Sequence, residues 1–172
     1  LLDHAEKIGA RDQIMIVEEP FPEEYEADVR DLGVRIAADE SAHSDDDVRT
    51  RIEMGYGAIA LKPIAKTLSM SLRMAGVPCF CADLTVNPVL VDWNKNVAAR
   101  LEPLPGMDIG VLETNGHQNY RRWNEMVSYH PCAGASWTRI EKGLFHLDDD
   151  FYARSGGILE PPAHYRALFP RD

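Results

Sequence analysis

Five short apolar runs recur along the first two thirds of the chain, and a charged residue stands at the end of each. Their spacing of about 20 to 30 residues suits one strand, one helix and two loops. The runs are continuously apolar rather than alternating, which is typical of parallel strands covered on both faces. The pattern therefore predicts a parallel sheet or barrel with charged side chains gathered at one end, at Glu18, Asp39, Lys62, Asp83 and Glu113.

Helical patterns fill most of the intervals between these runs. Residues 1–8 have apolar positions at helical spacing, and Gly9 is placed to end that helix. Pro22 followed by acidic residues predicts a second helix that ends before Gly33. Ser44 before three aspartates predicts the N-cap of a third. Two more are expected over residues 64–75 and from Pro88 to the prolines at 103 and 105.

The last third of the chain is less regular. Residues 117–129 suit a helix with Tyr120, Trp123, Met126 and Val127 on one face. Residues 131–172 contain proline, glycine and aromatic residues without a clear period, which indicates an irregular segment packed back on the domain. The aspartates at 148–150 lack the rest of an EF-hand pattern and predict a solvated loop.

Composition narrows the function classes. The chain has 172 residues, 45% of them hydrophobic, which is enough for one domain with a core. A net charge of −10 disfavours nucleic-acid and anionic-membrane partners and suits cation binding. The cysteines at 79, 81 and 132 do not form a disulfide framework, and no apolar run approaches the ~18 residues of a membrane span. We therefore expect a cytoplasmic protein. Because the chain opens on the apolar face of a helix, we also expect further chain before Leu1.

Three motifs resemble successive strand ends of the enolase superfamily, in its mandelate racemase/muconate-lactonizing branch. They are IVEEP at 16–20, AADES at 37–41 and ALKPIAK at 60–66, and the similarity extends over roughly residues 1–115. The resemblance implies an α/β fold, the C-terminal portion of a TIM-like (β/α) barrel. Residues 1–130 would hold barrel strands four to eight with their helices. The N-terminal capping domain and the first strands would precede Leu1.

The resemblance also implies roles for individual residues. Glu18 and Asp39 resemble two Mg²⁺ ligands, Lys62 resembles the sixth-strand lysine that acts as general acid/base, and Glu40 resembles the residue that orients this lysine. The third metal ligand and the second-strand Lys-x-Lys pair would lie before Leu1. The seventh strand ends at Asp83 without the histidine of a racemase-type His–Asp dyad, which disfavours that mechanism.

Other interpretations of these residues stay open. Glu18 and Asp39 also suit solvated strand ends or helix caps, and Lys62 suits a salt bridge to Glu40 or Asp39. Asp83 suits either substrate contact or the cap of a turn. Glu113 suits either substrate binding or a structural ion pair, and His117 suits the surface better than a pocket.

The chemistry that follows is metal-assisted abstraction of the α-proton of a small carboxylate substrate. Removing this proton creates a dianionic enediolate, which a hard cation such as Mg²⁺ stabilises. Enolase-superfamily sites use a lysine or histidine base with one or two Mg²⁺ ions. The expected outcome is racemisation, epimerisation or cycloisomerisation. The alternatives are a sugar-acid dehydratase of the same superfamily and a non-catalytic half-barrel fragment. A homo-oligomer is compatible with the resemblance.

Overall fold

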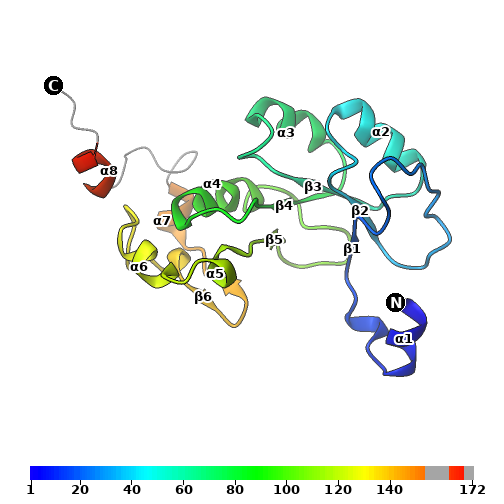
Figure 1. Ribbon diagram of the computed structural model, residues 1–172, viewed down its shortest axis with the longest axis horizontal. Helices are drawn as coiled ribbons and strands as arrows, with labels where there is room; N and C mark the ends of the chain where they lie inside the picture. The colour runs from blue at the N-terminus through cyan, green and yellow to red at the C-terminus, as the bar shows by residue number, and fades with distance from the viewer. Residues whose placement is uncertain (154–162, 169–172) are drawn as a thin grey trace. The chain divides into compact units, whose positions relative to one another are not determined.

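The computed structural model describes residues 1–153 and 163–168, and the five expected strands form one parallel sheet there (Figure 1). Their order in the sheet follows their order in the chain. Parallel pairing joins the first strand to the second, the second to the third, and the fourth to the fifth. The strands are β1 (Val17–Glu18), β2 (Ile36–Ala38), β3 (Ala58–Leu61), β4 (Cys79–Ala82) and β5 (Leu112–Glu113).

The three middle strands form the most deeply buried part of the chain. Every residue of β2, β3 and β4 is buried, as the continuous apolar runs predicted. The outer strands β1 and β5 are only two residues long, and none of their residues is fully buried. The buried strands fix the positions of the polar residues that follow them, because a chain leaving a packed sheet has little freedom in its first residues.

The chain divides into two compact units. The first comprises residues 1–61, 66–80 and 102–109, and the second comprises residues 62–65, 81–101 and 110–172. The helices of the first unit are α1 (Leu2–Lys7), α2 (Asp45–Glu53) and α3 (Leu68–Met74), with a short 3₁₀ turn, η1 (Arg11–Gln13). Figure 1 shows α2 and α3 side by side, and the two helices are in contact.

Local capping residues define the starts of α2 and α3. Ser44 Oγ accepts a hydrogen bond from Asp47 N at 3.2 Å, and Ser44 N donates to Asp47 Oδ2 at 2.8 Å, which completes a capping box. Helix α3 begins later than the expected residue 64, because Thr67 Oγ1 accepts from Met70 N and caps it there. Helix α1 ends before Gly9, whose φ of 69° suits glycine.

The helix expected over residues 22–32 is wrong. This stretch forms turns and irregular backbone instead. The side chain of Arg51 on α2 is buried, and its two terminal nitrogens donate to Tyr25 O at 2.7 Å and to Glu23 O at 2.6 Å. Carbonyl groups that a helix would use internally therefore serve a distant arginine. The segment is acidic, and its negative charge is compatible with a position close to the Arg51 guanidinium.

The second unit is built around α4 (Pro88–Ala98). Asn87 Oδ1 caps this helix by accepting from Val89 N and Leu90 N, and Pro88 occupies its first turn as expected. The single helix expected over residues 117–129 is wrong, because Tyr120 has an extended backbone (ψ 116°) and separates α5 (Gly116–Asn119) from α6 (Trp123–Ser128). Tyr120 Oη donates to Thr85 O at 2.9 Å, which holds the break in place.

The C-terminal segment has more regular structure than its sequence suggests. It contains η2 (Ser136–Thr138), an antiparallel hairpin of β6 (Ile140–Glu141) and β7 (Leu144–Phe145), α7 (Asp149–Ala153) and α8 (Ala163–Leu168). Its buried residues Trp137 and Phe151 meet edge to face at 5.6 Å between ring centroids. Asp148 accepts from Phe151 N and begins α7, so this aspartate is a helix cap. Residues 154–162 and 169–172 of the predicted segment lie outside the described residues.

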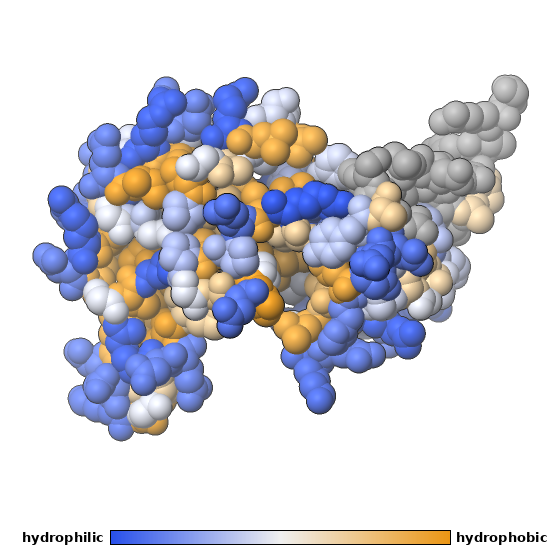
Figure 2. Space-filling model, turned by 180° about the vertical axis from the view of Figure 1, so that it is seen from behind, coloured by the Kyte–Doolittle hydropathy of each residue, from blue (hydrophilic) through white to orange (hydrophobic). Residues whose placement is uncertain are grey.

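Apolar side chains also reach the surface. Figure 2 shows them on one face between charged and polar ones. Exposed groups of this size mark surface that another segment or molecule commonly covers. Among the described residues, no helix combines the length and the apolar character that a bilayer crossing requires. The large hydrophobic residues with more than half of their surface exposed include Met15, Leu72, Leu84 and Ile109.

Candidate functional site

Three predicted site residues lie at the ends of two adjacent strands in the first unit. Glu18 is the last residue of β1 and pairs in register with Ala37, two residues before Asp39. Asp39 is only 5% exposed, whereas Glu18 and Glu40 are exposed. Glu18 and Asp39 therefore stand at the same end of the sheet, on neighbouring strands that lie about 4.8 Å apart.

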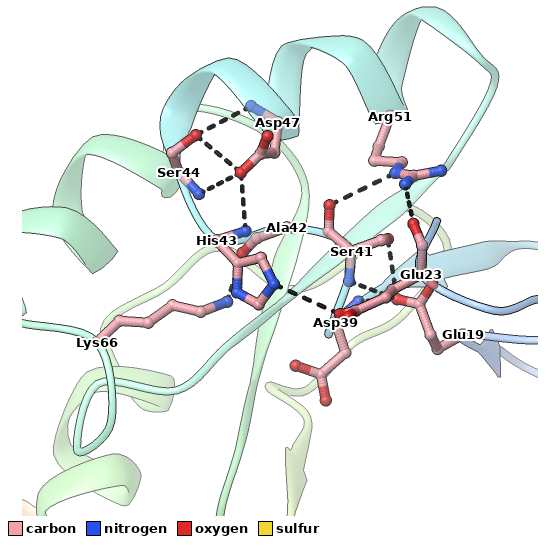
Figure 3. Close-up of polar contacts among 10 residues, drawn as sticks. All are labelled: Glu19, Glu23, Asp39, Ser41, Ala42, His43, Ser44, Asp47, Arg51 and Lys66. Atoms are coloured by element: carbon pink, nitrogen blue, oxygen red, sulfur yellow. Dashed lines mark hydrogen bonds and ion pairs between the residues drawn. The ribbon is translucent and has the colours of Figure 1, made fainter. Parts of the chain in front are cut away.

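Glu19, which the sequence analysis did not single out, fixes the backbone that follows β2. Its Oε2 accepts hydrogen bonds from Asp39 N at 2.6 Å, Ser41 N at 3.2 Å and Ser41 Oγ at 3.0 Å. Figure 3 shows the Asp39 side chain directed away from this carboxylate. The second glutamate of the EEP motif thus fixes the backbone of residues 38–41, which have the sequence ADES. We call Glu19 the clamp of this turn. The two glutamates look alike in sequence, and only their backbone distinguishes them: Glu19 has φ of 36°.

Two basic side chains donate hydrogen bonds to carbonyl groups at the end of the same turn (Figure 3). Lys66 Nζ donates to Ala42 O at 2.5 Å, and Arg51 Nε donates to Ser41 O at 3.5 Å. Lys66 is the second lysine of the ALKPIAK motif, and Ala42 directly follows the AADES motif. The backbone around Asp39 is consequently held from two directions.

The second unit holds the remaining predicted residues. Lys62 directly follows β3, is half-buried, and its carbonyl accepts from Ala65 N at 2.8 Å to close a turn. Asp83 follows β4, and Glu113 ends β5, where it pairs with Ala82. The convergence of Lys62 on Glu18 and Asp39 stays a prediction.

Asp83 and Glu113 belong to one hydrogen-bonded network. Asp83 is 4% exposed, its Oδ1 accepts from Thr85 N at 2.7 Å, and its Oδ2 accepts from Thr114 Oγ1. Asn115 connects the strands, since it donates to Glu113 Oε1 at 3.2 Å and accepts from Thr85 Oγ1 at 2.6 Å. The contacts of Asp83 are those of a turn cap, and a role in substrate binding stays a prediction for both carboxylates.

The donor atoms of the first unit suit Mg²⁺. This ion prefers oxygen ligands, keeps several waters, and is commonly held by one or two carboxylates. Glu18 and Asp39 supply two carboxylates on neighbouring strands, and the backbone of Asp39 is fixed by Glu19. Within residues 1–153 and 163–168, no group of three or more histidine, cysteine, aspartate or glutamate side chains could hold a metal. Glu18 and Asp39 would therefore supply only part of the ligand set of such a site.

A buried ionic cluster in the second unit was also missed by the sequence analysis. Asp92, Lys95 and His130 are each less than 5% exposed. Lys95 Nζ lies 2.7 Å from Asp92 Oδ1 and donates to Trp137 O at 2.6 Å, while His130 Nε2 lies 3.4 Å from Asp92 Oδ2. The cluster fastens the C-terminal segment to α4. Sequence shows the i, i+3 pair on the helix but gives no signal for a histidine 35 residues further on.

Burial and charge oppose each other in this cluster. Burial lowers the pKa of Lys95, and the negative charge of Asp92 only partly restores it. Burial alone would raise the pKa of Asp92, but hydrogen bonds and charge from His130 and Lys95 lower it below its ordinary value. Burial therefore dominates the pKa shift of Lys95, whereas hydrogen bonds and charge together outweigh burial at Asp92.

Two solved structures with a similar fold are mandelate racemase/muconate lactonizing proteins. A mandelate racemase/muconate lactonizing protein from Herpetosiphon aurantiacus aligns over 66% of this chain with a TM-score of 0.55 and 22% identity. A mandelate racemase/muconate lactonizing enzyme from Sorangium cellulosum aligns over 66% with a TM-score of 0.55 and 23% identity.

The likeness is confined to structure and to part of those proteins. No protein-family model matches the sequence, and no curated protein matches it. The aligned region is 34% of the Herpetosiphon chain and 33% of the Sorangium chain, so this chain spans about a third of the solved structures that it matches. The predicted resemblance is confirmed at the level of the fold: the chain has the architecture of part of a mandelate racemase/muconate lactonizing (β/α) barrel.

Proposed function

We propose that this chain forms part of an enolase-superfamily enzyme that removes the α-proton of a small carboxylate substrate with the help of Mg²⁺. The observation that carries the proposal is the pair of carboxylates on adjacent strand ends, Glu18 and Asp39, with the Asp39 backbone held by Glu19. A surface carboxylate pair needs no such clamp. The fold likeness to mandelate racemase/muconate lactonizing proteins supports the same class of chemistry.

Each residue has a distinct task in this proposal. Glu18 and Asp39 would hold the cation, which when bound would supply positive charge to stabilise the negative charge that develops on the substrate as its proton leaves. Lys62 Nζ takes the α-proton, and Glu40 orients Lys62. A lysine base must have a pKa far below the ordinary 10.4 or so, and a nearby cation and desolvation both act in that direction. Asp83 and Glu113 contact the substrate in this proposal.

The overall reaction is racemisation, epimerisation or cycloisomerisation. Dehydration of a sugar acid starts with the same proton abstraction and is the second enzymatic candidate. We place the protein in the cytoplasm because its cysteines, at positions 79, 81 and 132, do not have the number or spacing of a disulfide framework. A homo-oligomer is part of the proposal only by analogy with the group that the fold resembles.

A non-catalytic role is favoured by two observations. The described residues contain no three-ligand metal cluster, and both oxygens of Asp83 already serve the protein. A sheet fragment with unpaired edges would act by binding another chain. Divalent-cation binding that depends on Glu18 and Asp39 argues for the enzyme, and its absence argues for the binding fragment.

The reaction is tested by exchange of substrate α-protons with deuterium. The protein in its natural length is incubated in D₂O with Mg²⁺ and a panel of 2-hydroxy acids, sugar acids and N-acyl amino acids, and ¹H NMR records loss of each α-proton. We expect exchange for at least one class, abolished in Lys62→Ala and retained in Lys7→Ala, an exposed lysine on α1. Release of a 2-keto acid would identify a dehydratase. Exchange that survives Lys62→Ala would remove Lys62 as the base.

A further inference from the structure

A hollow of about 800 Å³ lies within the second unit, beside α5, α6 and β6. These elements can be followed at the C-terminal side of β5 in Figure 1. The hollow is unusual in this acidic chain because basic and aromatic side chains dominate its lining. The main ones are Tyr120, Arg121, Arg122, Trp123 and Arg139.

The arginines of this hollow differ in what they contact. Arg122 Nη2 pairs with Glu125 Oε2 at 2.6 Å. The side chains of Arg121 and Arg139 make no hydrogen bond or ion pair with any residue that the structure describes. Glu141, the other lining carboxylate, lies 3.9 Å from His146 Nε2. Two guanidinium groups on one hollow are thus available to a ligand, and guanidinium binds carboxylate and phosphate groups through paired N–H donors.

One wall of the hollow is built from aromatic rings. Tyr120 and Trp123 are near parallel, at 24° with ring centroids 6.5 Å apart, and His117 meets Trp123 edge to face at 6.3 Å. Tyr120 is anchored by its hydrogen bond to Thr85 O. A flat apolar group stacks favourably on such a surface.

Gly116 allows this wall to form. A Cβ atom at residue 116 would stand 2.4 Å from Val86 O and 2.7 Å from the Trp123 ring. Only glycine permits the start of α5 to approach the β4–α4 loop and the indole this closely. The wall is therefore part of the packed fold, and a ligand would not have to order it on binding.

We propose that this hollow binds a small organic anion, with its carboxylate or phosphate head group on Arg121 and Arg139 and a flat body against Trp123. The overall charge of −10 makes a long polyanion a poor ligand, whereas a small anion needs only the local guanidiniums. None of these residues takes part in the proton abstraction proposed above, so the two proposals stand or fall separately.

The binding test uses the indole N–H signals of the three tryptophans in ¹H–¹⁵N NMR spectra of the protein in its natural length, with Trp123→Phe assigning the signal of Trp123. Inorganic phosphate, succinate and benzoate are titrated at constant ionic strength against sodium chloride. We expect a saturable shift of the Trp123 signal and none at Trp93 or Trp137. Comparing the affinities for phosphate and succinate identifies the head group that the hollow prefers. Comparing the affinities for benzoate and succinate tests whether a flat ring stacks on Trp123.

Variants then assign the binding to the guanidiniums. Arg121→Gln and Arg139→Gln should each weaken binding about tenfold or more, because each removes a charge-assisted hydrogen bond. Arg49→Gln, at an exposed arginine on α2, should leave it unchanged. These exposed positions carry no core packing, so the variants should unfold at the same temperature as the wild type. No saturable shift with any probe, or equal affinity in all variants, would overturn the proposal.

Discussion

The carboxylate of Glu19 accepts a hydrogen bond from the backbone N–H of Asp39 at 2.6 Å, across two adjacent strands. The same oxygen accepts from Ser41 N and Ser41 Oγ, so three donors depend on one side chain. An unpaired glutamate on a surface turn would contribute little, whereas this one sets the backbone from which a proposed metal ligand extends. The strand ends are therefore connected before any cation binds.

Replacing Glu19 should damage both stability and cation binding. Glu19→Ala leaves the donors of Asp39 and Ser41 without their acceptor, which should cost about 1–3 kcal/mol in the free energy of unfolding. It should also weaken Mn²⁺ binding. Urea unfolding and calorimetric titration measure the two effects, with exposed Glu24→Ala as the matched control. Unchanged cation affinity in a folded Glu19→Ala protein would show that the clamp does not position the ligand.

Arg51 should contribute far more to the free energy of unfolding than an exposed arginine on the same helix. Arg51→Met removes the donors that hold Tyr25 O and Glu23 O. We expect the free energy of unfolding to fall by no more than about 1.5–3 kcal/mol for each of these charged hydrogen bonds. Arg49 forms only exposed pairs, so Arg49→Met should cost less than about 1 kcal/mol. Chemical denaturation compares them. Equal losses would contradict the account of why residues 22–32 are not helical.

The buried pair of Asp92 and Lys95 should show strong coupling. Lys95→Met leaves the Asp92 carboxylate buried without its ammonium partner, which should cost about 3–5 kcal/mol. The double variant Asp92→Asn/Lys95→Met should recover a substantial part of this loss, because no isolated charge remains. Unfolding measurements on the two single variants and the double variant give the coupling. Additive losses would mean that the two groups do not stabilise each other.

The lowered pKa of Asp92 gives this cluster a pH signature. Below its ordinary value of 3.8, the unfolded chain binds a proton at Asp92 that the folded protein does not bind. Stability from this group is therefore present above pH 3.8 and is lost as the pH falls toward the lowered pKa. The loss of stability between pH 5 and pH 3 should be larger in the wild type than in Asp92→Asn. Parallel profiles for the two proteins would contradict this assignment.

The three thiols should react at different rates. Burial raises the pKa of Cys79 to about 11, so this thiol carries almost no thiolate at pH 8, and Cys81 is also buried. Cys132 is only half-buried and should react first with a disulfide reagent. Loss of the fast phase in Cys132→Ser would confirm this order. A fast phase that persists in the variant would place reactive thiolate on the strand instead.

Sequence patterns predicted the elements whose causes are local. The apolar runs marked all five strands, because a covered parallel strand requires apolar residues on both faces. Ser44 and Pro88 marked helix starts through caps that involve only neighbouring residues. The expected helix at 22–32 is absent because its carbonyls bind Arg51, and the helix at 117–129 is broken where Tyr120 reaches Thr85. The sequence of each segment alone does not identify Arg51 or Thr85 as its partner.

The positions of the candidate site residues along the strands were predictable to the same extent, while their roles stay predictions. Glu18, Asp39 and Lys62 stand at strand ends as the motif spacing predicted. Glu19 was missed because its role depends on a left-handed backbone and on donors about 20 residues away. The cluster of Asp92, Lys95 and His130 was missed because its members meet only after the C-terminal segment packs on α4. Long-range contacts of this kind leave no periodic signal.

The most direct test of the proposed metal centre is a crystal structure of the protein in its natural length soaked with Mn²⁺, with anomalous diffraction locating the ion. We expect one ion bound by carboxylate oxygens of Glu18 and Asp39, at ~2.0–2.3 Å as expected for a hard divalent cation, with Lys62 Nζ facing the same space. An ion bound elsewhere, or Lys62 directed to the other side of the sheet, would contradict it.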